Sequence, residues 1–329
     1  MHDIITIGSG LRDVFLLSDQ FRLIANADFE GGTAECVALG SKIEVNDIVL
    51  TTGGGATNAA VTFARLGLKT AAICRIGDDA AGRDVVEDLK KEGVNTSLIR
   101  RVAKGVTGYS TLLTASNGER TALAYRGVSG TFSTTDVPFS KCKAKWFYVT
   151  SLAGNVALAK RIVAHAKSTG SLVAWNPGRK EIEKGLNAIK AILPNVRVLL
   201  LNKEEAAELS GKTTVEEMFA ALSTPGNVVV ITDGPRGAYI QRDPSTGSGQ
   251  AEILMSPGSG KQAVSQTGAG DAFGSGFVAG LMRTEDLRIA LAVGMLNAQS
   301  VITKVGAKAG ILKKWPSGAQ IKTINVTKV

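Results

Sequence analysis

The sequence predicts an α/β protein with a doubly wound, mainly parallel sheet, helices on both faces, and a small additional β-sheet. Apolar strand-like runs alternate with helical patterns along most of the 329 residues, which is typical of parallel strands joined by covering helices. Two segments, about 32–52 and 106–128, are rich in strand patterns and contain no helical one. We therefore expect a single domain, 1–329, with these two segments inserted as a β lid.

The elements are expected in alternation after a first strand that begins at residue 3. Helical patterns follow at 57–68, 81–94 and 156–170, and strand patterns at 69–77, 144–152 and 171–178. Residues 196–211 change from strand to helix at Asn202, and residues 227–241 predict two short strands around a turn. In the second lid segment, SNGE at 116–119 indicates a hairpin turn.

Composition excludes several classes of protein. The chain is 44% hydrophobic, but its apolar runs are far shorter than the roughly 18 residues that a membrane span requires, so no membrane partner is expected. The first residues carry an acid, Asp3, where a signal peptide carries positive charge, which indicates a cytoplasmic protein. Cys36, Cys74 and Cys142 lack the spacing of metal ligands and are expected to be buried thiols.

The formal net charge of +9 suits an acidic partner. However, the basic residues are scattered and aromatic residues make up only 5% of the chain, so nucleic acid is not expected as a partner. A local positive potential that attracts an anionic cosubstrate is the alternative. The two histidines, His2 and His165, are too few for a histidine-rich metal site, and His165 lies in a helical pattern where a structural role is expected.

The stretch TGAGDAFGSGF, residues 267–277, surrounds one carboxylate, Asp271, with small residues. Backbone N–H groups of Gly268, Ala269, Gly270 and Asp271, at the start of the predicted helix, would form a hollow that favours negative charge. A carboxylate beside that hollow can accept a proton from a substrate hydroxyl, as phosphoryl transfer to an alcohol requires. Asp271 is therefore predicted to be a general base. The alternative is an N-cap that only starts the helix.

Other polar residues follow the ends of predicted strands, where open parallel sheets bind ligands. Asp13 comes after the first strand, and the glycines of 51–55 would let a ligand approach the backbone, with Asn58 in the next helical turn. Asn202 and Glu205 follow a buried strand and could reach toward a metal-bound phosphate. The same pair is equally good helix-capping chemistry.

Two long motifs resemble the signature regions of the ribokinase-like (PfkB) carbohydrate kinases. They are TTGGGATNAAVTFARLG at 51–67 and SQTGAGDAFGSGFVAGL at 265–281, in the right order, with LNKEEAAEL and ITDGPRGA between them. The resemblance covers essentially the whole chain. It implies ATP- and magnesium-dependent phosphorylation of a sugar or nucleoside hydroxyl, on a doubly wound sheet with a small β lid.

Carried over residue by residue, the resemblance implies a role for each matching position. It implies substrate binding by Asp13, Gly53, Gly54 and Asn58; catalysis by Asp271, with Gly268, Ala269 and Gly270 as the anion hole; nucleotide binding by Asn202, Thr232, Gly234, Gly237, Asn297 and Ser300; and an indirect role in magnesium binding for Asn202 and Glu205.

The chain departs from the family pattern immediately before the glycine-rich hollow. Many members have an Asp-Thr pair there, and this chain has Ser265 and Gln266. That aspartate helps to bind a monovalent cation in members activated by potassium. We therefore expect only weak stimulation by potassium.

The sequence leaves open which acceptor such a kinase would use, and it allows two interpretations other than a kinase. A ribose- or fructose-like sugar is favoured over an adenosine-like nucleoside, because a base needs apolar or aromatic walls and the lid segments offer mainly Tyr109 and Tyr125, with Phe15 as a further contributor. A catalytically silent sugar-binding protein on the same fold is the second interpretation. A dinucleotide enzyme is the third, but GSGLRDVF does not continue as the glycine fingerprint that it requires.

The lid leads to two further expectations. A phosphorylated sugar would need contacts to its own phosphate, for which Arg12, Lys42 and Arg126 are the candidates. Strand alternation without helices to cover both faces predicts an exposed apolar face on the lid, and we expect this face to pair with a second subunit as a homodimer.

Overall fold

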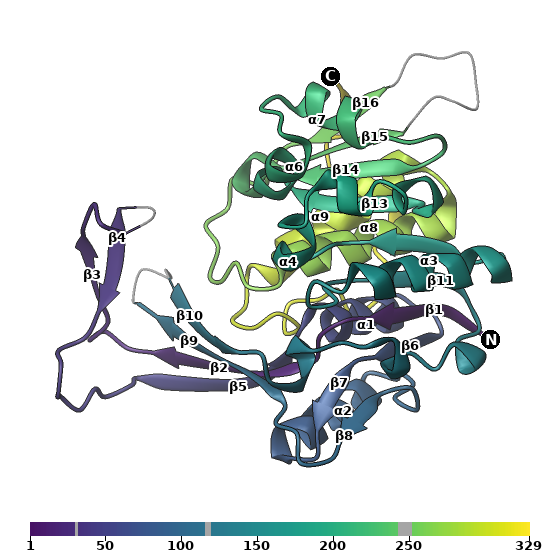
Figure 1. Cartoon of the computed structure of the whole chain (residues 1–329). Coiled ribbons are helices and arrows are strands. Elements are labelled where there is room, and N and C mark those ends of the chain that lie inside the picture. The colour runs from purple at the N-terminus through teal and green to yellow at the C-terminus, as the bar shows by residue number, and fades with distance from the viewer. Residues whose placement is uncertain (30–31, 116–119, 243–251) are drawn as a thin grey trace.

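The computed structural model of the chain describes residues 1–29, 32–115, 120–242 and 252–329. Within these residues, a nine-stranded sheet has the order β17-β16-β15-β14-β13-β12-β11-β1-β6 (Figure 1). The parallel strands are β1 (His2–Ile7), β6 (Thr70–Ile73), β11 (Ala144–Val149), β12 (Leu172–Trp175), β13 (Val198–Asn202) and β14 (Val228–Thr232). The antiparallel extension consists of β15 (Ala238–Arg242), β16 (Ile253–Ser256) and β17 (Thr327–Lys328).

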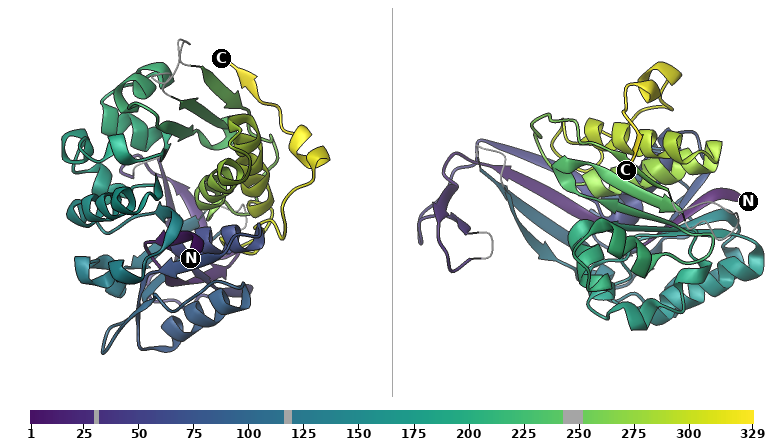
Figure 2. Two further views of the ribbon diagram at one scale, coloured as in Figure 1. Left: turned by 90° about the vertical axis from the view of Figure 1, so that its right-hand side faces the viewer. Right: turned by 90° about the horizontal axis from the view of Figure 1, so that it is seen from above.

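Helices cover both faces of this sheet (Figure 2). One layer consists of α1 (Gly55–Arg65), α8 (Ala269–Thr284) and α9 (Leu287–Val301); the other includes α3 (Val156–Thr169), α4 (Arg179–Ile182), α5 (Leu186–Ile189), α6 (Lys203–Ser210) and α7 (Val215–Leu222). Alternate side chains of β11 enter the two cores, with Tyr148 on the α8 side and Phe147 on the α3 side. The predicted doubly wound α/β class is confirmed.

Local sequence explains where several helices begin and end. Helix α2 (Ala80–Lys91) starts at Asp79, whose carboxylate accepts a hydrogen bond from the N–H of Gly82 at 2.8 Å. Helix α3 starts at Asn155 in the same way and ends at Gly170, which has a φ of 68° that favours glycine. The predicted segment 69–77 is two strands, because β7 (Arg75–Gly77) leaves the main sheet and pairs with β8 (Arg100–Val102).

The lid is a four-stranded sheet that projects from the main body (Figure 1). Its order is β10 (Arg120–Tyr125), β9 (Gly108–Thr114), β2 (Leu11–Leu17) and β5 (Asp47–Gly53). Strand β2 was not predicted as part of the lid, because only Gly8–Gly10 separate it from the first strand of the main sheet. The predicted SNGE turn between β9 and β10 lies outside the described residues.

The first lid segment is not one continuous layer, in contrast to the prediction for 32–52. Strand β4 (Thr33–Cys36) pairs with β3 (Arg22–Ala25) in a separate two-stranded sheet beyond the lid (Figure 1). Only β5 from this segment joins the four-stranded sheet. The shorter elements are η1 (Gly127–Gly130), η2 (Thr134–Asp136), η3 (Phe139–Lys141), η4 (Leu193–Asn195), η5 (Gly234–Arg236) and α10 (Gly318–Lys322).

The structure also bears on the predictions for the cysteines, for His165 and for membrane-spanning helices. Cys74 and Cys142 are buried free thiols as predicted, whereas Cys36 is only half-buried. His165 packs against the rings of Phe139 and Phe147, which agrees with a structural role. None of the helices in the described ranges has the length and hydropathy needed to span a bilayer.

Candidate active site

A cavity of about 270 Å³ opens at the carboxyl ends of the central strands, beside the first turn of α8. This is the edge at which open parallel sheets bind ligands. The cavity brings together predicted site residues from three separate motifs: Asn202, Glu205, Thr232, Gly268, Gly270 and Asp271. Tyr148 and Asn176 also line it, although neither was predicted.

The first turn of α8 presents unpaired backbone donors. Gly268 is the N-cap with a φ of 82°, and a Cβ at this position would lie 2.4 Å from the Cβ of Ala307. The N–H of Ala269 donates to Gln266 O at 3.2 Å, so it is engaged within the turn. The N–H groups of Gly270 and Asp271 have no acceptor in the described part of the chain, and the space beside Gly270 is open. Two donors at the positive end of a helix dipole therefore face the cavity region.

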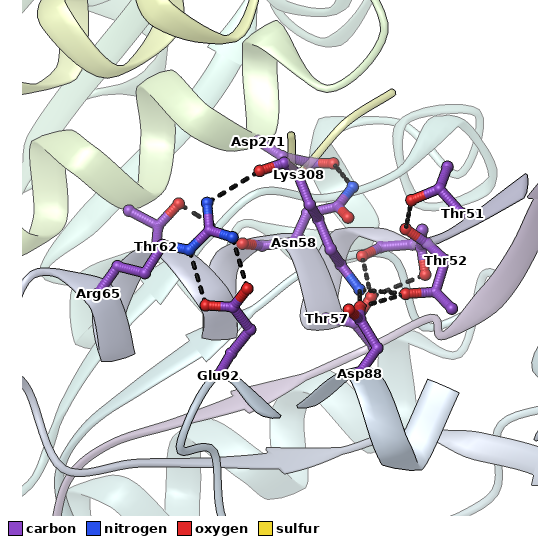
Figure 3. A network of polar contacts seen from close by, with 12 residues as sticks. Thr51, Thr52, Thr57, Asn58, Thr62, Arg65, Asp88, Glu92, Asp271 and Lys308 are labelled. Atoms are coloured by element: carbon purple, nitrogen blue, oxygen red, sulfur yellow. Dashed lines mark hydrogen bonds and ion pairs between the residues drawn. The ribbon is translucent and has the colours of Figure 1, made fainter. Parts of the chain in front are cut away.

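Asp271 joins the two signature motifs through a hydrogen bond. Its Oδ2 accepts from Asn58 Nδ2 of α1 at 2.8 Å, across 213 positions of sequence (Figure 3). Burial raises the pKa of the Asp271 carboxyl, while the hydrogen bond from Asn58 and the charge of Lys308 oppose this shift. The N-cap alternative is wrong, because the cap is Gly268 and no side chain caps this helix.

The two ends of the Asn58 amide differ in their hydrogen bonding. The residue is 4% exposed, and its Oδ1 is buried without a hydrogen-bond partner among the described residues. A buried carbonyl oxygen of this kind costs free energy until a donor reaches it. The hydroxyl of a bound acceptor, next to Asp271, is a donor that would satisfy it.

Asp13 approaches the same region from the lid. It lies in β2 rather than at the end of the first strand, is 6% exposed, and packs against Gly53 so closely that a Cβ there would lie 1.9 Å from Asp13 Oδ2. Burial raises the pKa of Asp13 to about 6, and the negative charge of Asp271 adds to this shift, whereas a hydrogen bond from Ser110 and the charge of Lys308 lower it. Asp13 and Asp271 therefore interact electrostatically across the site.

Gly54 makes the approach of the lid possible. It has a φ of 100°, and a Cβ would lie 2.5 Å from Ser9 O, immediately before the first lid strand. The N–H of Gly55 donates to Ser9 Oγ at 3.1 Å, which fixes the start of α1 beside this turn. The glycines at 53–54 thus serve close packing of the backbone around Asp13.

Asn202 and Glu205 line the cavity and cap α6 at the same time. The N–H of Glu205 donates to Asn202 Oδ1 at 2.8 Å, and the N–H of Asn202 donates to Glu205 Oε2 at 2.9 Å. Burial is the main cause of a raised pKa for Glu205. No cluster of three acidic, histidine or cysteine ligands occurs in the described part of the chain. The Glu205 carboxylate and the Asn202 amide oxygen are the kind of donor that Mg²⁺ accepts beside phosphate and water oxygens, so their chemistry fits that ion.

The structure places the other residues predicted to bind the nucleotide in different surroundings. Thr232 lines the cavity, and Gly234 lies exposed in the following turn. Gly237 has a φ of 109° and packs on Ser256 O. The backbone conformation and this close contact explain why position 237 is a glycine. Ser300 is half-buried on α9 and does not line the cavity.

Asn297 is committed to the interior. It is fully buried, its Nδ2 donates to Ala272 O at 2.8 Å and to Thr62 Oγ1 at 3.3 Å, and its Oδ1 accepts from the N–H of Leu312 at 3.0 Å. These bonds join α9 to α1 and α8. The donor and acceptor groups of the side chain are therefore engaged within the protein.

Sequence reasoning missed Tyr148, Asn176 and Lys308. Asn176 follows β12, so the rule used for other strand ends could have found it. Tyr148 is fully buried in β11, and its hydroxyl has no hydrogen-bond partner among the described residues. A Cβ at Gly274 would lie 2.6 Å from this hydroxyl, so the glycine makes room for it. No sequence signal distinguishes Tyr148 from other core aromatics.

Comparison with known proteins identifies the family. Residues 23–314 match the model of the pfkB family carbohydrate kinases. The chain is 30% identical over 255 residues to an uncharacterized sugar kinase of Archaeoglobus fulgidus, covering 76% of this chain and 97% of that protein. It is also 30% identical over 273 residues to a ribokinase of Haemophilus influenzae, with 79% and 83% covered.

A solved structure supports the fold. A protein of E. coli assigned as ribokinase II, in complex with ATP and Mg²⁺, superposes with a TM-score of 0.76 at 20% identity, covering 98% of each chain. The chain belongs to the PfkB family of carbohydrate kinases. It is thus a phosphotransferase with an alcohol group as acceptor.

Proposed function

We propose that this kinase transfers the γ-phosphoryl group of ATP to a hydroxyl of an uncharged, ribose- or fructose-like sugar, with Asp271 as the general base. One observation carries the proposal: the Asp271 carboxylate lies at N–H groups of α8 that have no acceptor among the described residues, and it is bonded to an Asn58 whose other amide end has no partner among them either. This arrangement combines a proton acceptor, a hydroxyl-binding group and donors for developing negative charge.

Each residue of the site would have a distinct role in phosphoryl transfer. Asn58 Oδ1 and Asp13 would accept hydrogen bonds from acceptor hydroxyls, and Asp271 would remove the proton from the attacking hydroxyl. The N–H groups of Gly270 and Asp271 would stabilise charge on the transferring group. Bound Mg²⁺, held near Glu205 and Asn202, would neutralise phosphate charge. Catalysis would then consist of positioning and electrostatic stabilisation.

The lid supports an uncharged acceptor over a sugar phosphate. Arg12 precedes Asp13 in β2 and therefore points to the opposite face of the sheet, where Asp84 of α2 binds its guanidinium. Lys42 and Arg126 are both exposed. A second cavity of about 520 Å³ at the far end of the lid is lined by Asp19 and Asp47, and the described residues that line it include no lysine or arginine. Carboxylates there oppose a second phosphate.

The lid also supports a sugar over a nucleoside. Tyr109 pairs with Arg12 across the sheet, and Tyr125 pairs with Tyr109, so both rings share the face opposite to Asp13. The two tyrosines that were candidates to enclose the base of a nucleoside therefore point away from the acceptor side of the lid. Phe15 lies on the Asp13 face but is only 1% exposed.

A screen of acceptors tests this proposal. ADP release would be followed with ATP and Mg²⁺ over a panel of neutral sugars, sugar phosphates and nucleosides, with Asp271→Asn as the inactive control. We expect neutral sugars to give the highest kcat/KM. Sugar binding without ADP release would identify a catalytically silent binding protein, and a preference for sugar phosphates or nucleosides would overturn the acceptor assignment.

We further propose that the outer face of the lid forms a homodimer. Ile48, Leu50, Tyr109, Leu123 and Tyr125 lie on the face opposite to Asp13 and are all exposed, by 39% to 59%. Contiguous exposed apolar residues of this kind mark interaction surfaces. A second copy would cover the face without closing the acceptor side.

A further inference from the structure

The hydroxyl of Tyr148 is a polar group to which the proposed reaction has not yet given a role. Tyr148 lies in β11 and is fully buried, and its hydroxyl has no hydrogen-bond partner among the described residues. The ring makes an edge-to-face contact with Phe63 of α1, with the ring centroids 5.3 Å apart. A buried hydroxyl without a partner costs free energy. Packing of the core therefore explains the aromatic ring at this position but not its hydroxyl.

The hydroxyl lies against the helix that carries the proposed base. A Cβ at Gly274 of α8 would lie 2.6 Å from the hydroxyl oxygen, which thus occupies the place of a side chain at this position. Positions 271 and 274 share one face of the helix and are about 4.5 Å apart along its axis. Tyr148, Asp271 and Gly274 also line one cavity, together with Gly270. The hydroxyl is therefore on the Asp271 side of α8, at the proposed site of phosphoryl transfer.

The surroundings of this hydroxyl favour an anionic ligand. The N–H groups of Gly270 and Asp271 have no acceptor among the described residues, and the positive end of the α8 dipole adds to their effect. Burial and the negative charge of Asp271 raise the pKa of Tyr148 well above its usual value, so the phenol keeps its proton and can donate a hydrogen bond. A protonated phenol beside two backbone donors is suited to a phosphate oxygen.

The buried cations drawn in Figure 3 are engaged by protein groups. Lys308 Nζ donates to Thr52 Oγ1 at 2.6 Å and to Asp88 Oδ2 at 2.8 Å. Arg65 is bound by Glu92 and donates to the carbonyl oxygen of Lys308 at 3.0 Å. The described residues that line the cavity include no lysine or arginine. A phosphate bound there would therefore depend on neutral donors of the protein and on Mg²⁺, which increases the importance of each hydroxyl and N–H group.

We propose that the Tyr148 hydroxyl donates a hydrogen bond to an oxygen of the γ-phosphoryl group, together with the N–H groups of Gly270 and Asp271. The inference rests on the proposed function, because that function places the γ-phosphoryl group at these N–H groups. It gives the buried hydroxyl a partner, and it explains why position 274, where a Cβ would displace the hydroxyl, is a glycine. A donor that is already fixed by packing stabilises the charge of the transferring group without reorganisation.

The first test compares Tyr148→Phe with Tyr239→Phe. The control removes the hydroxyl of a half-buried tyrosine in β15, which packs on the α3 side of the main sheet and does not line the cavity. Calorimetry gives the Kd of each protein for the Mg²⁺ complexes of ADP and of the β,γ-imido analogue of ATP. In Tyr148→Phe we expect the analogue to bind about tenfold or more weakly, because a hydrogen bond to a charged group is lost, and ADP to bind within about twofold of wild type. Tyr239→Phe should change neither Kd.

The second readout is the ¹³Cζ resonance of Tyr148 in the wild-type protein. The chain has four tyrosines, so this signal can be assigned by elimination from phenylalanine variants of the other three, even if Tyr148→Phe does not fold. We expect the ATP analogue to shift the signal more than ADP does. Equal shifts for the two nucleotides, or no shift with either, would contradict the proposed contact.

Two results of the binding test would overturn the inference: equal losses of affinity for ADP and the analogue, or no loss for either. Unchanged affinities together with a lower melting temperature of ligand-free Tyr148→Phe would assign the hydroxyl to a structural water instead. If wild type phosphorylates no acceptor, the proposed function fails on its own, because both readouts are measured without an acceptor.

Discussion

Replacing Asp271 by asparagine is the most direct test of the site, because the structure predicts which properties survive. The amide oxygen of the new side chain can still accept the hydrogen bond that Asn58 Nδ2 donates to Asp271. The side chain does not cap α8, so the start of the helix is unaffected. Burial raises the pKa of Asp271, which shows that the charged form is disfavoured there. The free energy of unfolding should therefore not fall.

The rate should fall steeply, because an amide cannot take the hydroxyl proton. Loss of a general base costs about two to four orders of magnitude in kcat, which corresponds to roughly 3–5 kcal/mol of activation free energy. Binding of ATP should change little. Removing the Asp271 charge should also lower the pKa of Asp13 below about 6, because the repulsion between them raises it.

The assay measures kcat, the Kd for ATP and the melting temperature on one preparation of each protein. Asp13→Asn provides a matched control, since it removes the other buried carboxylate and should raise the acceptor KM more than it lowers kcat. A folded, ATP-binding Asp271→Asn protein that turns over within about tenfold of wild type would remove Asp271 from the mechanism.

Four further outcomes are expected. Exchange of sodium for potassium at constant ionic strength should raise kcat by less than about twofold, because this chain has Ser265 where the family resemblance implies a cation-binding aspartate; an increase of about tenfold or more, or about 1.4 kcal/mol, would show this reasoning to be wrong. Tyr148→Phe should leave the free energy of unfolding in urea unchanged or raise it by about 1 kcal/mol, because the hydroxyl is buried with no hydrogen-bond partner among the described residues; a clear loss of stability would reveal a partner such as bound water. Asp13→Asn should stabilise the fold at pH 7.5 by up to about 2–3 kcal/mol and not at pH 4, because a folded pKa of about 6, above the unfolded value, makes the wild type lose stability as the pH rises from about 4 to 6; equal effects at both pH values would contradict this linkage. Sedimentation velocity at micromolar concentration should show a dimer for wild type and a monomer for Leu50→Lys, with Ala220→Lys on the exposed side of α7, outside the lid, as control for added charge; a wild-type monomer would refute the dimer.

Alternating strand-like and helical patterns of apolar residues predicted most of the main sheet. They could do so because each strand or helix can be recognised from the spacing of apolar residues within its own segment. Strands such as β13 and β14 are continuous apolar runs, and α3 has an asparagine cap and a terminal glycine. Strand β2 was missed because the chain changes sheets over only three residues, 8–10. The departure of β4 from the lid depends on pairing with β3, a partner that strand propensity alone does not specify.

The site residues that belong to one local motif could be predicted from the sequence. Asp271 and the glycines before it could be recognised because a helix start, small residues and an acid occur together in one stretch. Lys308 and Tyr148 could not, because their significance lies in burial and in neighbours that are distant in sequence. For Asn297, motif spacing does not reveal that its amide joins α9 to α1 and α8.

The two-residue strand β17 changes what the main sheet presents to other molecules. Thr327 and Lys328 pair with Met255 and Leu254 of β16, and the N–H of Val329 donates to Ile253 O at 3.0 Å. Without them, β16 would be an apolar strand with a free row of backbone groups, the kind of edge on which chains associate and aggregate. Residues 327–329 therefore occupy backbone groups of β16 and place Lys328, a residue typical of protected edges, at this edge of the sheet.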